Sequence, residues 1–102
     1  MIYNYTPHDI ILVKGNKRTV FHPCGLARVS QKSETVNYID GFPVKRVTYG
    51  EVAGLPLENG NDYYIVSTLC AQNSKRNDLI VPCDSIRDEH GVIIGCSSFA
   101  LV

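Results

Sequence analysis

Short apolar runs recur along the whole chain, and glycine, proline, asparagine or aspartate residues separate most of them. Runs rich in β-branched and aromatic residues favour strands, so the pattern predicts about eight short strands. The candidate runs are residues 2–5, 10–13, 19–21, 26–30, 35–39, 43–49, 63–66, 79–81 and 92–94. Because turn signals stand between neighbouring runs, the strands are expected to pair mainly as antiparallel neighbours.

The intervening polar segments are predicted to be turns or loops. Residues 31–34 are polar, and residues 50–56 contain two glycines and a proline, so neither segment is expected to form a strand. The Asp-Gly dipeptide at 40–41 is expected to reverse the chain. The Asn-Gly dipeptide at 59–60 is the usual centre of a two-residue β-hairpin loop.

One segment differs from the strands, because polar residues replace the apolar pattern after Val66. Ser67 can cap a helix by accepting a hydrogen bond from a backbone N–H group of the first turn. The residues that follow predict a short helix from Thr68 to about Lys75. Lys75 and Arg76 would then lie in the last turn, where cations interact favourably with the helix dipole.

Length and composition limit the class of protein to which the chain can belong. With 102 residues, 44% of them hydrophobic, the chain fits one domain, residues 1–102, of β-rich α+β architecture. A folded chain of 11.3 kDa is expected to expose roughly 5,700 Å² of surface. Residues 99–102 form an apolar tail that needs cover from the sheet or from another chain, so we expect self-association.

Charge and hydropathy exclude several kinds of partner. Ten basic residues balance ten acidic ones, so the chain lacks the basic excess of a general nucleic-acid binder, although a local cluster can still hold a small anion. No apolar run approaches the ~18 residues that a membrane span needs. The first residues lack the basic segment and cleavage site of a secretion signal. We therefore expect a cytoplasmic protein without a membrane partner.

No residue pattern predicts catalysis or a bound metal. The four cysteines are Cys24, Cys70, Cys83 and Cys96. Their spacing is not that of zinc ligands, and in the cytoplasm they are expected to be reduced thiols packed as small hydrophobes. A small hydrolase would use His22 with Cys24, or His8 with Asp9, but neither pair has an evident third group to orient it. We therefore expect no catalytic residue, no metal and no cofactor.

The residue types favour binding of a small anionic molecule. The segment after Val66 places hydroxyls, amides and cations beside a helix start, where backbone N–H groups can hold a phosphate. Arginines suit phosphate oxygens, and tyrosines offer a flat face to a base. The candidate ligand-binding residues are Arg28, Tyr49, Tyr63, Ser67, Thr68, Gln72, Asn73, Arg76, Arg87 and Asp88. Any one of these residues, taken alone, more often has a structural role than a binding role. The prediction of a binding site therefore depends on their clustering.

Five segments, in order along the chain, resemble a family of small phage and prophage proteins. They are YTPHDI near the N-terminus, ARVS at 27–30, YGEVAGLP at 49–56, YYIVSTLCAQNSKRNDLIVP at 63–82 and IRDEHGVIIGC at 86–96. The chain is similar in these segments to the first-described family of Thoeris anti-defence proteins. The resemblance implies a non-enzymatic, β-rich sponge that sequesters cyclic ADP-ribose isomers made by bacterial TIR-domain enzymes.

The same resemblance implies an assembly and a ligand pocket. It implies dimers that assemble into hexamers, and in some members a separate arginine-lined site for cyclic di- or trinucleotides. An aromatic ring would stack on the adenine of the signal, and either Tyr49 or Tyr63 could supply it. Asn73 or Asn59 would be the asparagine close to that ring.

Arg87 and Asp88 are the best match to the arginine-lined site, although residues 82–87 are compact where relatives are expected to carry a longer loop. Two other functions stay open. A small nucleotide hydrolase or lyase would use one of the two histidine pairs named above. A structural phage assembly protein would use its apolar tail to build an assembly and would bind no small molecule.

Overall fold

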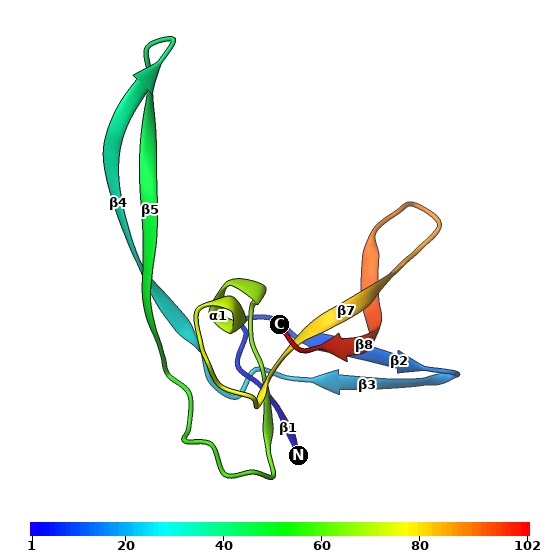
Figure 1. Ribbon diagram of the computed structural model, residues 1–102. Coiled ribbons are helices and arrows are strands. Elements are labelled where there is room, and N and C mark those ends of the chain that lie inside the picture. Colours follow the sequence, from blue (N-terminus) through cyan, green and yellow to red (C-terminus); the bar gives the residue numbers. More distant parts are fainter.

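The computed structural model describes all 102 residues and contains eight strands and one helix (Figure 1). The elements are β1 (Ile2–Asn4), β2 (Ile10–Lys14), β3 (Lys17–Phe21), β4 (Arg28–Ile39), β5 (Phe42–Ala53), β6 (Tyr63–Ile65), α1 (Thr68–Gln72), β7 (Leu79–Arg87) and β8 (Ile93–Ala100). The chain is strand-dominated with one short helix, which confirms the coarse β-rich α+β prediction.

Six strands form one mixed sheet in the order β1-β6-β7-β8-β2-β3. β6 pairs in parallel with β1 and β7, and β2 pairs in parallel with β8, whereas β7 with β8 and β2 with β3 are antiparallel. The expected antiparallel pairing is therefore wrong for β6 with both of its neighbours and for β2 with β8, and Asn59 does not centre a hairpin. Asn59 Oδ1 instead accepts hydrogen bonds from the backbone N–H groups of Asn61 (2.8 Å) and Asp62 (2.9 Å), which turns the chain before the parallel pairing.

β4 and β5 form a separate hairpin that projects away from the six-stranded sheet (Figure 1). We call residues 31–50 of this hairpin the arm. At its tip, Asp40 and Gly41 have φ values of 51° and 82°, as in the type I′ turn that Asp-Gly favours. The predicted loop at 31–34 is wrong, as is the first part of the predicted loop at 50–56, because the antiparallel ladder satisfies the backbone whatever the side chains are.

Two other strands are longer than their apolar runs. β7 continues past Pro82, which pairs with Phe99 of β8, and ends at Arg87. The apolar tail is partly covered, because Phe99 belongs to β8 and meets Phe21 of β3 edge-on with ring centroids 6.0 Å apart. Leu101 after it is 71% exposed.

The core lies between α1 and the β6–β7 part of the sheet. Its buried cluster comprises Ala27, Tyr64, Val66, Cys70, Ala71, Leu79 and Val81. Tyr64 stacks on Tyr3 and meets Tyr5 edge-on, with ring centroids 5.9 Å and 5.4 Å apart. All four cysteines are free, and burial raises the pKa of the Cys96 thiol. Only 13 of 102 residues are buried, so the core is small for this chain.

Candidate functional site

The helix start predicted to hold a phosphate is already capped by its own side chain. The backbone N–H group of Cys70 donates to Ser67 Oγ at 3.2 Å, which confirms Ser67 as the N-cap. Thr68 and Gln72 are exposed at the two ends of α1. The helix has only five residues, so its dipole is too short to attract an anion strongly.

The helix ends three residues earlier than predicted, and this changes the positions of the cations. Asn73 is the C-cap, so Lys75 and Arg76 follow the helix and do not lie in its last turn. This segment lines a groove of about 460 Å³ together with the base of the β4–β5 hairpin and the loop that follows. The lining residues are Glu51, Val52, Leu55, Asn73, Ser74, Lys75 and Arg76. Two of the ten candidate residues, Asn73 and Arg76, therefore share one groove.

Arg76 has a structural partner inside the chain. Its Nε and Nη2 atoms donate to the Asp78 carboxylate at 2.9 and 2.6 Å, and its guanidinium lies 5.6 Å from the centre of the Tyr64 ring. The hydrogen bond to Asp78 raises the pKa of Arg76. The paired carboxylate offsets much of this positive charge, and only the Nη1 side of the guanidinium remains for a ligand.

Asn73 and Lys75 have more freedom than Arg76. Asn73 Nδ2 donates to the Leu69 carbonyl at 2.9 Å, whereas its Oδ1 has no partner within the chain. Lys75 is exposed and forms no ion pair. The groove thus offers one amide oxygen and one free ammonium group to a molecule that enters it.

The two candidate tyrosines lie in different places. Tyr49 lies opposite Gln31 and lines a separate hollow of about 340 Å³ on the arm. A bulge on β5 puts it on the same face of the hairpin as Val52, which lines the groove. Tyr63 lines another hollow, whose other side chains are mostly acidic or amide groups. Neither tyrosine lines the groove, and Tyr49 is the one that shares a hairpin face with it.

The remaining candidates do not reach the groove. Arg87 Nη1 donates to the Gly91 carbonyl at 2.7 Å, and Asp88 Oδ1 accepts from the backbone N–H groups of His90 and Val92 at 2.8 and 3.0 Å. Both hold the β7–β8 turn, which lies far from α1 in Figure 1. Arg28 is exposed at the start of β4, opposite Ala53.

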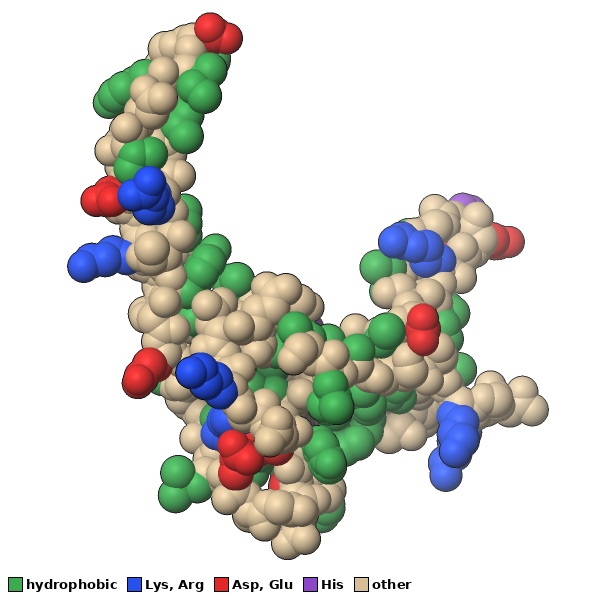
Figure 2. Space-filling view, viewed as in Figure 1, with side chains coloured by type: hydrophobic (Ala, Val, Ile, Leu, Met, Phe, Trp, Pro, Cys, Tyr) green, Lys and Arg blue, Asp and Glu red, His purple; other side chains and the backbone are tan.

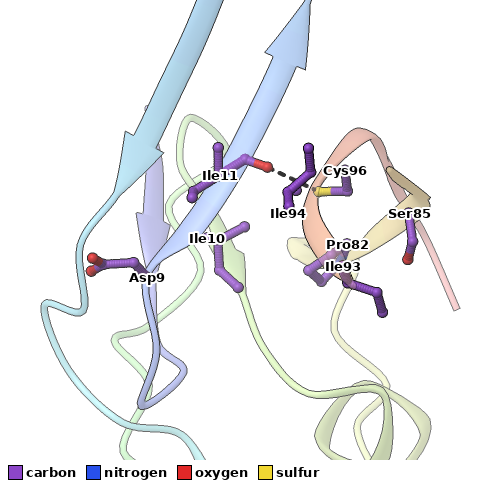
Figure 3. A pocket seen from close by; sticks show the side chains of 9 residues that line it. Asp9, Ile10, Ile11, Pro82, Ser85, Ile93, Ile94 and Cys96 are labelled. Carbon is purple, nitrogen blue, oxygen red and sulfur yellow. Dashed lines mark hydrogen bonds between the residues drawn. The ribbon is translucent and has the colours of Figure 1, made fainter. Parts of the chain in front are cut away.

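The structure adds two features that sequence reasoning missed. A cavity of about 210 Å³ lies between β2 and the β7–β8 hairpin, where the Ile-Ile dipeptides at 10–11 and 93–94 meet (Figure 3). At its edge, His22 Nδ1 contacts Asp9 Oδ1 at 2.9 Å. Cys24 Sγ donates to the Asn4 carbonyl at 3.4 Å, so the His22–Cys24 pair of the hydrolase alternative does not form, and His22 contacts Asp9 instead.

Asn4 is a buried polar residue that the sequence pattern did not single out. Its Nδ2 donates to the carbonyls of His8 and Phe21 at 2.6 and 2.7 Å, and its Oδ1 accepts from the Thr6 backbone at 2.9 Å. With all of these bonds satisfied, Asn4 ties β1 to the turn before β2 and to the end of β3. It has no capacity left to bind a ligand.

The comparisons with known proteins place the chain in no family. No family model matches it, and neither the curated proteins nor the solved structures contain a match. The structure gathers no group of three or more histidine, cysteine, aspartate or glutamate side chains that could hold a metal ion. It has no helix of the length and hydropathy needed to cross a bilayer.

Proposed function

We propose that the protein is a phage anti-defence sponge, which binds cyclic ADP-ribose isomers in the cytoplasm of the host cell and keeps them from the defence effector without cleaving them. The groove at residues 73–76 carries the proposal, because it combines an amide oxygen and an ammonium group, and Tyr49 lies on the same hairpin face as Val52, which lines the groove. Its volume of about 460 Å³ lies within the ~300–1,000 Å³ range of small-molecule sites.

In this proposal the cations hold the pyrophosphate of the signal. Lys75 and the free side of Arg76 face the groove, whereas the carbonyl end of α1 repels anions and Glu51 adds a negative charge. The adenine would stack on Tyr49, and Asn73 Oδ1 would accept a hydrogen bond from its amino group. A second site for cyclic oligonucleotides at Arg87 and Asp88 would compete with the hydrogen bonds by which both residues hold the β7–β8 turn.

Calorimetric titration with the cyclic ADP-ribose isomers that a TIR-domain enzyme makes from NAD⁺ tests the proposal. We expect Lys75→Ala and Asn73→Ala each to weaken binding about tenfold or more, because each removes a hydrogen bond that forms away from bulk water. Lys14→Ala, at the far end of β2, removes the same charge outside the groove and should bind normally. Full affinity in both groove variants would place the ligand elsewhere.

Sequestration also predicts the chemical state of the bound molecule. Heating the complex should release the cyclic isomer unchanged, and a linear or cleaved product would reject the sponge in favour of the hydrolase or lyase alternative. The His22–Asp9 contact is the feature that such an enzyme would use. Retained turnover in His22→Ala would then exclude that version of the enzyme.

A role in phage assembly is the second candidate function, and the exposed apolar arm favours it. This function predicts no small-molecule binding. A thermal-shift screen of nucleotides separates the two candidates, because a sponge melts at a higher temperature with its ligand bound, whereas an assembly protein does not respond.

A further inference from the structure

The tip of the arm is apolar and exposed to solvent. Tyr38, Ile39 and Phe42 are 66%, 59% and 73% exposed, although they stand next to one another across the type I′ turn. The strand pairing puts Tyr38 on one face of the hairpin and Ile39 with Phe42 on the other, so apolar side chains cover both faces of the tip. Figure 2 shows hydrophobic side chains along this end of the molecule. A two-stranded hairpin with so little cover is at best marginally stable alone.

The exposed area of the whole chain is also too large for a monomer of this mass. The solvent-accessible surface is 7455 Å², against roughly 5,700 Å² expected for 11.3 kDa. The excess of roughly 1,800 Å² is about twice the ~800 Å² that each partner buries in a standard interface. An excess of this size matches the surface that a chain loses when it assembles with other copies of itself.

A second apolar surface is exposed on the part of the sheet formed by β2, β7 and β8. It surrounds the cavity of about 210 Å³, where Ile10 of β2 stands across from Pro82 and Ile93 of β7 and β8 (Figure 3). Ile93 and Ile94 are 54% and 47% exposed. A dry cavity of about 150 Å³ is enough to hold a benzene ring, so this one can accept an aromatic side chain.

We propose that the tip of the arm of one chain packs into this cavity on a second copy of the chain. In Figure 1 the arm stands on one side of α1, whereas β2, β7 and β8 lie on the other, and the arm belongs to a separate two-stranded sheet, so its tip does not reach the cavity of its own chain. Phe42, the most exposed of the three tip residues, enters the cavity. Each copy gives one arm and receives one, as in a two-fold symmetric pair. The inference does not depend on the proposed ligand.

The mass of the protein in solution tests the proposal. Light scattering on the wild type should give a multiple of 11.3 kDa, and Phe42→Asp should reduce the mass to that of one chain, because a buried charge cannot enter an apolar cavity. Thr48→Asp puts the same charge on the polar face of the arm, opposite Lys32, and should keep the wild-type mass. A monomeric wild type, or a Phe42→Asp variant that stays assembled, would overturn the proposal.

A second experiment identifies the receiving surface and does not need a destabilised variant. Replacing Phe42 by photoreactive benzoylphenylalanine keeps an aromatic side chain at the tip. Irradiation should join two chains, with the cross-link between position 42 and residues 93–96, as peptide mass spectrometry will show. Cross-links only within a chain, or only to another segment of a second chain, would reject this docking surface.

Discussion

At the scale of single residues, the pair formed by Arg76 and Asp78 decides how the candidate site can be studied. The sequence grouped Arg76 with Asn73 as candidate residues, and both line the groove because they are close along the chain. It did not predict the ion pair, although Asp78 is only two residues away, because sequence spacing does not show that the carboxylate is buried. Arg76 therefore supports the fold before it can serve a ligand.

We expect Arg76→Ala to destabilise the folded state by about 2–3 kcal/mol, because it leaves the Asp78 side chain, which is 10% exposed, without its cation. Urea unfolding measures this difference. Lys75→Ala, at the exposed neighbouring position, should change the unfolding free energy by less than about 0.5 kcal/mol. If Arg76→Ala were as stable as the wild type, the ion pair would have no structural role and the guanidinium would be free for a ligand.

At the scale of elements, the sequence predicted turns and caps better than strand partners. Asp40-Gly41 and Ser67 were found because their chemistry is local: a positive φ in one case, a side-chain acceptor in the other. The parallel pairing of β6 with β1 was missed, because it joins residues about sixty positions apart and leaves no local pattern. The groove was found only in part, since Glu51 and Leu55 come from a segment that was predicted to be a loop.

The arm also depends on one of these local features, and Gly41→Val tests it. Gly41 has a φ of 82°, and a Cβ atom there would have no other atom within 4 Å, so the expected cost is the backbone strain of about 1–2 kcal/mol for a β-branched residue. Hydrogen exchange of the arm amides should become about tenfold faster, with that of β6 and β7 unchanged. Asp40→Asn, which suits the same turn, is the matched control. Unchanged exchange in Gly41→Val would mean that the turn does not limit the opening of the arm.

At the scale of the whole molecule, the shape is too extended for an independent domain. The radius of gyration is 16.7 Å, against roughly 13 Å for a compact chain of this length, and the longest extent is 52 Å. Strand prediction could not reveal this, because alternating apolar residues look alike whether they are covered by the same chain or by another. The pattern of apolar residues along the sequence therefore does not explain the exposed isoleucines and tyrosines that lie far from the small core.

If other copies supply the missing cover, folding and assembly are coupled, and the melting temperature depends on protein concentration. Each tenfold rise in concentration favours the assembled state by about 1.4 kcal/mol, which corresponds to about 4 °C for a two-chain unit of this size. Calorimetry over a hundredfold range of wild-type concentration should therefore show a steady rise in melting temperature. The Phe42→Asp variant should melt at a lower temperature that does not change with concentration. A constant melting temperature for the wild type would show that one chain folds without help, and that its small core is sufficient for the whole structure, including the arm.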